Sequence, residues 1–362
     1  MDVSLTAKNL NFFGVFNATG VGRHTENAFM GACRTRAGDV HVRYVNHDRK
    51  SSVRRLIADS RPQTDTTLFF WRQPLELLQQ VRGCRVGWLF FESDKVPQVW
   101  LQQMDAFDRL WMPSQWGRDV LVAHGLAQAK IRVVESGINE RFYFPKPAEH
   151  TGFVFLFIGK HEPRKSLEET IAAFVQEFPV SAHPDVQLWV KADHPVFPQR
   201  VSQLRKRYAQ EPRVRFVSGL FSDEQLSMLY NRADAFVYPT KAEGFGLPCI
   251  EALACGLPVI TTECSAQTAF LRYVQGLFYP VQFEMRDLQD DDYAYFYSRD
   301  YAGQGFGHWA VPKIESIRAG MREIYENAGD WRERARQASQ IIHQNFSWDR
   351  IGRKAVDTAL AG

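Results

Sequence analysis

The sequence lacks the features that mark several classes of protein. Its cysteines contain no C-x-x-C pair, so neither a disulfide framework nor a zinc site is expected, and reduced, mostly buried thiols are predicted. The five are Cys33, Cys84, Cys249, Cys255 and Cys264. The longest clean apolar run, residues 153–158, is far shorter than the roughly 20 residues of a transmembrane helix, and no basic segment with an apolar core opens the chain. We therefore expect a cytoplasmic protein.

Metal-binding patterns are also missing. The ten histidines form no H-x-x-x-H pair, so no zinc hydrolase is indicated. The triplet Asp290-Asp-Asp292 resembles a metal-binding carboxylate motif, but it stands apart from the other candidate residues, and we interpret it as a solvated loop. No bound metal or cofactor is predicted.

Length and composition favour an ordinary globular protein. The chain has 362 residues, of which 45% are hydrophobic, 23% charged and 13% aromatic. At roughly 100 to 200 residues per domain, this length predicts two domains, each large enough to bury its own core. Disorder as the main state is excluded.

The small net charge of +3 is unevenly distributed. Residues 1–148 carry 20 Lys and Arg against 14 Asp and Glu. Much of this excess lies in Arg43, Arg49, Lys50, Arg54, Arg55 and Arg61. Two interpretations fit: peripheral contact with an anionic surface, such as the inner face of a membrane or an anionic substrate, or a merely solvated face. No nucleic-acid partner is expected.

Apolar runs alternate with segments of helical period, which is typical of βαβ units and parallel sheets. Strands are predicted at 11–16, 40–45, 67–70, 86–91, 110–112 and 131–134, and again at 153–158, 186–191, 214–217, 235–238 and 259–262. The proline-punctuated stretch 143–150 predicts a linker, so we expect domains at 1–148 and 150–345 with a terminal helix at 347–360. Residues 281–308 look irregular.

The most informative stretch is the loop and helix between residues 239 and 260. Gly244 and Gly246 allow a tight backbone path, and Pro248 suits the first position of a helix that stops at Gly256. Backbone N–H groups and a positive helix end would then face one point and attract an anion. Glu243 on the loop and Glu251, expected in the first helical turn, are eight positions apart and can converge on one ligand.

Glu251 has two interpretations. Near a positive helix end it should stay ionised and can accept hydrogen bonds from two hydroxyls at once, as a ribose diol offers. Alternatively, it merely complements the helix dipole. Its position past the capping-box site weakens the second interpretation.

The stretch Glu243-Gly-Phe-Gly-Leu-Pro-Cys-Ile-Glu251 resembles the E-x7-E signature of retaining GT-B glycosyltransferases of the family 4 type. Three earlier stretches also stand in the family's order: Gly20-Val-Gly-Arg-His24, the stretch from 87–92 to 112–116, and Gly159-Lys-His-Glu-Pro-Arg-Lys-Ser166. The resemblance therefore covers nearly the whole chain. It implies two Rossmann-like, doubly wound α/β domains facing across a cleft. The second domain would hold the nucleotide sugar, and the terminal helix would pack back on the first.

The resemblance also implies roles for particular residues. Glu243 would contact the transferred sugar, Glu251 the ribose, and Lys160 with Lys165 the diphosphate. The other donor-binding candidates are Gly244, Phe245, Gly246, Leu247, Gly219, Gly22 and Arg23. Lys160 stands where an arginine is usual, and a lysine lacks the bidentate fork. Solvent-facing charge is the alternative for both lysines, and Arg164 is interpreted as a solvated neighbour.

In the first domain, Gly20-Val-Gly22 is predicted to lie between a strand and a helix that starts near Arg23, so its backbone can approach a ligand. Arg23 would then face donor phosphate or an acidic acceptor, or else be a surface charge at a helix end. A Gly-x-Gly alone is a weak signal.

The acceptor-side candidates follow the strand expected at 86–91. Glu92, Ser93 and Asp94 stand where parallel strands place polar groups at a ligand crevice. The alternative for Ser93 and Asp94 is a helix cap. Many relatives carry a histidine near here, and this chain does not.

The implied function is a retaining, metal-independent transfer of a hexosyl group from a nucleoside-diphosphate sugar to a hydroxyl of a glycan or lipid-linked acceptor. Such enzymes often work in polysaccharide or lipopolysaccharide assembly. The alternatives are a catalytically silent nucleotide-sugar-binding subunit of an assembly complex and another GT-B enzyme, such as a sugar-nucleotide epimerase.

Overall fold

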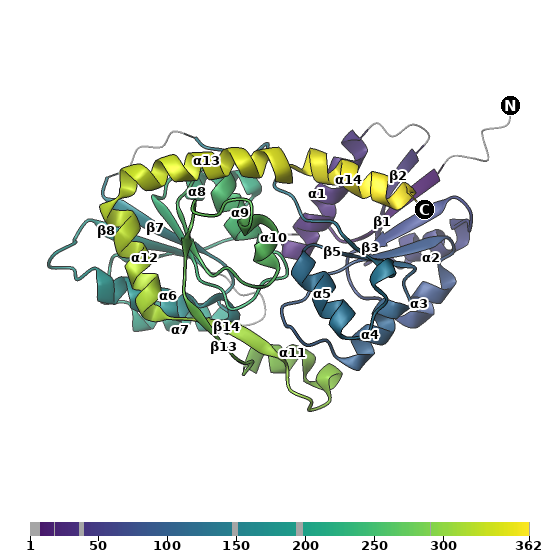
Figure 1. Ribbon diagram of the computed structural model, residues 1–362, viewed down its shortest axis with the longest axis horizontal. Coiled ribbons are helices and arrows are strands. Elements are labelled where there is room, and N and C mark those ends of the chain that lie inside the picture. Colours follow the sequence, from purple (N-terminus) through teal and green to yellow (C-terminus); the bar gives the residue numbers. More distant parts are fainter. Residues whose placement is uncertain are drawn as a thin grey trace. The chain divides into compact units, whose positions relative to one another are not determined.

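The computed structural model describes residues 8–17, 19–35, 40–146, 151–192, 198–289 and 291–361. The chain forms two compact units. Unit 1 consists of Met1–Asn139, Arg299–Gln304 and Asn345–Gly362, and unit 2 of Glu140–Ser298 and Gly305–Gln344. Each unit is built on a six-stranded sheet covered by helices (Figure 1). The predicted pair of doubly wound α/β domains is therefore confirmed.

The sheet of unit 1 has the order β2-β1-β3-β4-β5-β6, and its neighbouring strands are parallel. The strands are β1 (Lys8–Gly14), β2 (Val40–Asn46), β3 (Asp65–Phe69), β4 (Cys84–Trp88), β5 (Arg109–Met112) and β6 (Ile131–Val133). After its first residue β1 is buried throughout, as a strand covered on both faces requires, whereas β2 at the edge alternates between exposed and partly buried residues.

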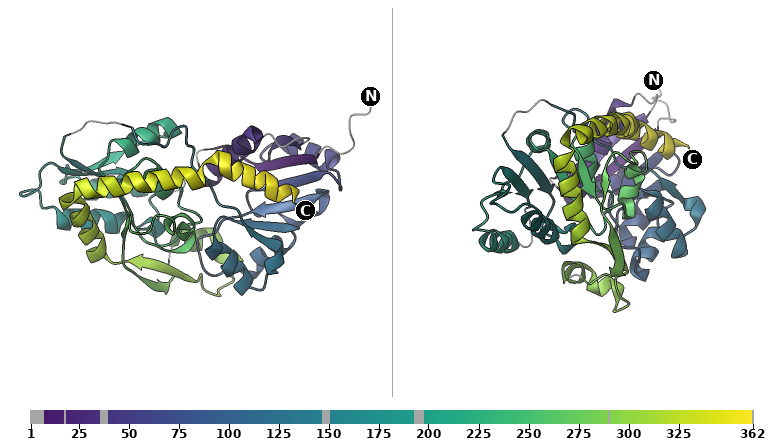
Figure 2. Two further views of the ribbon diagram at one scale, coloured as in Figure 1. Left: turned by 45° about the horizontal axis from the view of Figure 1, so that its top comes forward. Right: turned by 60° about the vertical axis from the view of Figure 1, so that its left-hand side comes forward.

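The helices of unit 1 come from both ends of the sequence. They are α1 (Gly20–Arg34), α2 (Lys50–Asp59), α3 (Leu75–Gln80), α4 (Gln98–Asp105), α5 (Gln115–Ala123), the 3₁₀ turn η1 (Gln128–Lys130) and α14 (Trp348–Leu360). The backbones of α1 and α14 touch, because a Cβ on Gly31 would lie 2.4 Å from the carbonyl oxygen of Trp348 (Figures 1 and 2). Trp348 joins Phe12, Trp88 and Trp111 in one buried cluster.

The sheet of unit 2 has the order β12-β11-β10-β7-β8-β9, again parallel. The strands are β7 (Phe153–Ile158), β8 (Val186–Lys191), β9 (Val214–Val217), β10 (Ala235–Tyr238), β11 (Val259–Thr261) and β12 (Tyr279–Pro280). The apolar run that forms β7 is wholly buried at the centre of the sheet. The chain runs from β7 to β8 and β9 on one side and then returns to β10 on the other, so the strand order reverses between β7 and β10.

Helices and 3₁₀ turns connect these strands and follow them. They are η2 (Pro163–Lys165), α6 (Leu167–Glu177), α7 (Pro198–Arg207), α8 (Asp223–Asn231), α9 (Leu247–Ala254), η3 (Ser265–Gln267), α10 (Thr268–Leu271), α12 (Ile314–Glu326) and α13 (Ala328–Phe346). No helix in the described ranges combines the length and apolar character needed to cross a membrane.

The segment 281–308 is more regular than expected. It contains β13 (Phe283–Asp287), α11 (Asp291–Tyr301) and the first residue of β14 (His308–Pro312), and β13 and β14 form an antiparallel pair apart from the six-stranded sheet (Figure 2). The prediction of a solvated Asp290–Asp292 loop is wrong for Asp291 and Asp292, which begin α11; Asp290 lies outside the described residues. Tyr301 and Trp309 of this region are both buried.

Candidate active site

The loop after β10 leads directly into the start of a helix, as the glycine pattern predicted. Gly246 caps α9 with a φ of 95°, in the left-handed region, and a Cβ there would lie 2.9 Å from the Gln267 side chain, so only glycine fits. Pro248 occupies the second helical position instead of the first. The helix ends at Ala254, and Gly256, with a φ of 70°, follows its C-cap.

Glu243 lies at the centre of a buried charged cluster. Its Oε1 atom accepts a hydrogen bond from Lys165 Nζ at 2.6 Å and from the Tyr238 hydroxyl at 3.0 Å. Lys165 Nζ also donates to the Tyr238 hydroxyl at 2.7 Å, and Arg164 Nη1 lies 3.1 Å from the same Glu243 oxygen. The structure thus brings together two predicted site residues and adds two that the sequence did not single out.

Burial and charge act against each other in this cluster. Burial alone would raise the pKa of Glu243, but Lys165 and Arg164 together bring it below its ordinary value. Burial lowers the pKa of Lys165, and the attraction of Glu243 opposes this without cancelling it. Glu243 is therefore held as a carboxylate, and its ion pair is what retains the charge on Lys165.

Three loops are fastened together around this cluster. The amide of Lys241 donates to the Arg164 carbonyl at 2.8 Å, Arg164 Nη1 donates to the Ala242 carbonyl at 2.7 Å, and the amide of Glu243 donates to Ser265 Oγ at 2.8 Å. These loops follow β7, β10 and β11, which are neighbours in the sheet. The cluster therefore sits where the strand order reverses, the usual ligand position in open α/β sheets.

Lys160 and Arg164, from the same loop, differ in exposure. The side chain of Lys160 is 45% exposed and lies 3.6 Å from Glu162, so it stands at the outer end of the charge chain. The side chain of Arg164 is only 12% exposed and also pairs with Glu162, at 3.1 Å. The prediction of a solvated Arg164 is wrong, because Glu162, the Ala242 carbonyl and Glu243 enclose its guanidinium.

Glu251 lies in the second turn of α9, not in the first as expected, because the helix begins at Leu247. Its carboxylate is buried and accepts a hydrogen bond from the Tyr230 hydroxyl at 3.0 Å. Burial, with Glu251 adding to it, raises the pKa of Tyr230 well above the ordinary value, so Tyr230 stays protonated and donates. One Glu251 oxygen is thus oriented by the protein.

The remaining donor-side candidates of unit 2 differ in exposure. Gly244 and Phe245 are buried, and the Phe245 ring packs edge-on against Phe270 at 5.3 Å, while Leu247 is half-buried. Gly219 is exposed with a φ of 114°. Two residues on, the Phe221 ring lies 5.2 Å from Lys191 Nζ.

The Gly20–Gly22 turn belongs to the helix and does not precede it. Helix α1 begins at Gly20, and Thr19 Oγ1 accepts from the Gly22 amide at 3.1 Å, so the expectation of a start near Arg23 is wrong. A Cβ on Gly22 would lie 2.0 Å from Asn17 Oδ1. The loop's own packing therefore requires this glycine, while Arg23 is half-buried in the first turn.

The acceptor-side candidates lie on the loop that follows β4. Glu92 and Asp94 are half-buried. Helix α4 begins only at Gln98 with Pro97 as its N-cap, so the alternative of a helix cap by Ser93 or Asp94 is wrong. Ser93 Oγ instead accepts from the amide of Lys95 at 3.1 Å within the loop.

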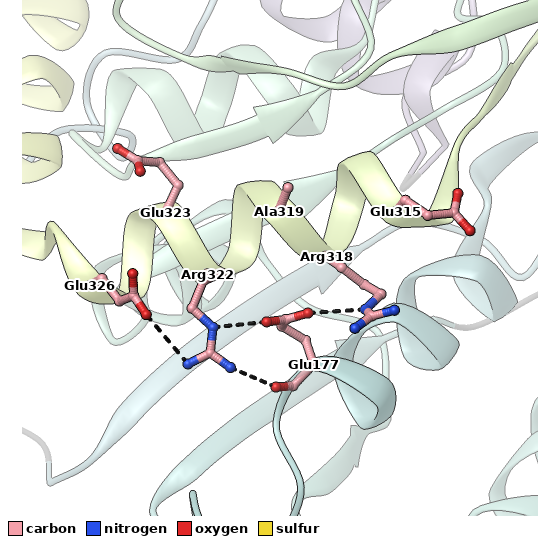
Figure 3. A pocket seen from close by; sticks show the side chains of 7 residues that line it. All are labelled: Glu177, Glu315, Arg318, Ala319, Arg322, Glu323 and Glu326. Atoms are coloured by element: carbon pink, nitrogen blue, oxygen red, sulfur yellow. Dashed lines mark hydrogen bonds and ion pairs between the residues drawn. The ribbon is translucent and has the colours of Figure 1, made fainter.

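The described part of unit 2 contains cavities beside the sheet's charged cluster and beside α12. One, of about 540 Å³, includes His161, Glu162 and Lys241 in its lining and so adjoins the charged cluster. The other, of about 420 Å³, lies against α12; there Glu177 is held by Arg318 and Arg322, with Nε–carboxylate distances of 3.0 and 2.8 Å (Figure 3). In the part of the chain that the structure describes, no three His, Cys, Asp or Glu side chains are grouped to hold a metal ion.

Residues 152–284 match the family model described as "Glycosyl transferases group 1". The matched range contains the β7 strand, the 160–166 loop and the whole of the Glu243–Glu251 segment. The matched range lies within unit 2, and the charged cluster around Glu243 lies inside it.

Curated relatives with named activities match parts of the chain. O-antigen chain mannosyltransferase B of Escherichia coli is 37% identical over 111 residues, which are 31% of this chain and 29% of that protein. Glycogen synthase of Mycobacterium tuberculosis is 26% identical over 277 residues, 76% of this chain and 56% of that protein. The chain thus covers less than two thirds of the length of either relative.

Solved structures show the same fold over almost the whole chain. HepE of Anabaena in complex with UDP and glucose superimposes with a TM-score of 0.71 at 16% identity, covering 98% of this chain and 100% of that one. A sucrose-phosphate synthase of Thermosynechococcus elongatus gives a TM-score of 0.67 at 16% identity, covering 97% and 98%. The fold is GT-B, with two parallel-sheet α/β domains.

Proposed function

We propose that the chain is a retaining glycosyltransferase that transfers a sugar from a nucleoside-diphosphate sugar to a hydroxyl acceptor without a metal ion. The observation that carries the proposal is the buried Glu243–Lys165 pair at the β7/β10 reversal of unit 2, with Arg164 and Tyr238 around it. The start of α9 lies beside it in the chain and adds N–H groups that suit a diphosphate.

In this proposal Lys165 stabilises the leaving group. Its ammonium has three N–H donors, of which Glu243 and Tyr238 accept two, and the third serves the diphosphate. The bond between the anomeric carbon and the phosphate oxygen breaks, and the bond to the acceptor oxygen forms on the same face of the sugar. The acceptor proton goes to the departing phosphate, so no protein nucleophile takes part. Negative charge grows on that phosphate, where a fixed cation acts most strongly.

Glu243 and Glu251 serve different parts of the donor. Glu243, kept ionised by its cations, faces the transferred sugar, and Glu251 accepts from the ribose hydroxyls while Tyr230 orients it. Because relatives of the chain are named as mannosyltransferases, GDP-mannose is the first donor to test. A mannosyl glycan or lipid-linked acceptor and a role in polysaccharide or lipopolysaccharide assembly belong to the same proposal.

Peripheral contact with an anionic membrane is a further part of it. The basic residues singled out in the sequence are all exposed in unit 1: Arg43, Arg49, Lys50, Arg54, Arg55 and Arg61. Exposed cations of this kind are attracted to anionic lipids by about 1 kcal/mol each. The charge is thus available for a lipid-linked acceptor at a surface.

The test uses the purified chain with GDP-mannose or UDP-glucose, EDTA, and octyl α-mannoside as acceptor. We expect release of the nucleoside diphosphate at a rate that EDTA leaves unchanged, and proton NMR of the product should show the donor's anomeric configuration. Binding of nucleotide without turnover would indicate a silent subunit. An inverted product would contradict the retaining mechanism, and a rate lost in EDTA and restored by Mg²⁺ would contradict metal independence.

A further inference from the structure

A short segment, Arg299–Gln304, is assigned to unit 1 although the residues on both sides of it belong to unit 2. We call it the anchor segment. It holds the end of α11 and the turn that follows, with Ala302 at a φ of 47° and Gly303 at 76°. Of these two residues only Ala302 is strained, because glycine adopts a positive φ without a steric cost.

The anchor segment is hydrogen-bonded to Lys95, a residue of the acceptor-side loop. Tyr301 is buried, and its hydroxyl donates to the carbonyl of Lys95 at 2.8 Å. Lys95 Nζ in turn donates to the carbonyl of Gln304. The residue next to Asp94 is therefore bonded to the segment through both its backbone and its side chain.

A second group of contacts connects the anchor segment to Arg72, earlier in the chain than the loop, and to Trp100, after it. Asp300 Oδ2 accepts from Trp100 Nε1 at 2.6 Å and lies 3.9 Å from Arg72, whose guanidinium stacks 3.5 Å from the centroid of the Trp100 ring. The Tyr301 ring meets Trp100 edge-on at 5.7 Å. Arg72 follows β3 and Trp100 lies on α4, so these contacts connect the segment to the helix that follows the loop.

The loop also has hydrogen bonds to residues outside the anchor segment. Residues 92–96 lie between the end of β4 and the start of α4, outside the sheet's ladder. The amide of Lys95 donates to Ser93 Oγ at 3.1 Å, and the amide of Val96 donates to His124 Nε2 at 3.3 Å. In both of these bonds the loop contributes an amide. The Tyr301 hydroxyl instead bonds a carbonyl of the loop, that of Lys95.

We propose that Tyr301 is a positioning residue of the acceptor site: through its hydroxyl bond to Lys95 it fixes the loop that carries Glu92 and Asp94, and acceptor recognition depends on it. This inference rests on the proposed glycosyltransferase function. It gives the anchor segment a part in using the acceptor.

The substitution Tyr301→Phe tests the inference, because it keeps the ring against Trp100 and removes only the hydroxyl. We expect the KM for octyl α-mannoside to rise about three- to tenfold, the change that the loss of one hydrogen bond produces. The KM for GDP-mannose and the slow hydrolysis of GDP-mannose without acceptor should stay unchanged. Amide hydrogen exchange at residues 92–96 should become faster.

The matched control is Tyr44→Phe. Tyr44 also lies in unit 1, and its hydroxyl also donates to a backbone carbonyl, that of Gly14, at 3.2 Å. A general loss of stability would affect both variants, so only the acceptor KM and exchange at 92–96 distinguish them. An unchanged acceptor KM in folded Tyr301→Phe, or equal effects in both variants, would overturn the inference.

Hydrogen exchange needs no substrate and separates this inference from the proposed function. If the wild-type chain transfers no sugar, the proposed function fails, and faster exchange at 92–96 in Tyr301→Phe still supports the anchoring. Unchanged exchange there overturns the anchoring whatever the activity.

Discussion

The two units carry similar sheets, but Glu243 of unit 2 and His24 of unit 1, both buried and ionisable, have opposite surroundings. In unit 2 the reversal of strand order is occupied by paired charges, with Glu243 bonded to Lys165 and close to Arg164. In unit 1 the buried side chain of His24 pairs through Nδ1 with Ser136 Oγ at 2.8 Å and is surrounded by aromatic rings, and no ion pair to it is formed among the residues that the structure describes.

The difference separates a site from a core. Paired charges in unit 2 remain ionised and preorganised for an anionic ligand. Burying such charges costs desolvation free energy, as is typical of a functional site. In unit 1, burial lowers the pKa of His24 to about 3, so this side chain is neutral and structural. Unit 1 therefore has a neutral core at His24, and its loops are held by separate hydrogen bonds. Unit 2 has a preformed polar centre at Glu243.

The largest expected effect is the loss of the buried cation. Lys165→Ala should lower kcat about 10²- to 10³-fold, as deletion of an oxyanion-stabilising donor does, and should weaken donor binding less, because the extra charge appears only as the bond breaks. Lys160→Ala is the control from the same loop and, being exposed, should lose much less. Near-normal kcat with a raised KM in Lys165→Ala would reduce the role of Lys165 to donor binding.

The second prediction concerns His24, the neutral buried side chain of unit 1, and the pH dependence of stability. His24 titrates near 6.5 when unfolded but near 3 when folded, so its contribution to stability is complete above pH 6.5 and is lost as the pH falls towards 3. At about 1.4 kcal/mol per pH unit, the free energy of unfolding should drop by about 2 to 3 kcal/mol between pH 6.5 and 4.5. Urea titrations of the wild type and His24→Phe measure it, and an equal pH dependence in both would refute it.

The third prediction concerns the second carboxylate of unit 2. Glu251→Gln replaces a charged acceptor by an amide, and each charge-assisted bond lost to the ribose should cost about 1.5 to 3 kcal/mol of nucleotide affinity. Tyr230→Phe removes only the orienting hydroxyl and should cost less. Calorimetry with GDP and UDP gives both values, and an unchanged dissociation constant in Glu251→Gln would rule out the ribose assignment.

The smallest effect is a gain in stability. Ser166 has a φ of 54°, and its buried Oγ has no hydrogen-bond partner in the described structure, so Ser166→Gly should stabilise the fold by about 0.5 to 1 kcal/mol. Ser265, with a φ of 50°, is the matched control, because its Oγ accepts from the Glu243 amide and glycine there removes that bond. Thermal unfolding should move in opposite directions in the two variants, and a shared direction would disprove the comparison.

The sequence predicted most of the architecture because buried parallel strands are read from short apolar runs. Residues 153–158, 186–191, 214–217 and 235–238 are strands within the predicted bounds. The glycine-rich loop before α9 was also predictable, since φ at Gly246 admits little else. These features depend on local patterns of residue type.

The rest depends on partners far away in the chain. Arg164 looked solvated because a run of charged residues in a loop carries no signal of burial, and Ala242 and Glu243, about 80 positions later, enclose it. The segment 281–308 looked irregular because its anchor, Tyr301, packs on Trp100, about 200 positions earlier. Tyr238 ends an apolar strand, so its hydroxyl gave no sign of a polar role.

The contact between Gly31 and the start of α14 has a consequence for the order in which the protein forms. The buried cluster of unit 1 includes Trp348, Ile351 and Val356 alongside Leu10 and Phe12. During synthesis, the strands that emerge first must therefore wait for residues made some 200 positions after their own sheet is complete. Unit 2 closes its sheet in the interval, so the half of the protein that is translated first is the half that finishes folding last.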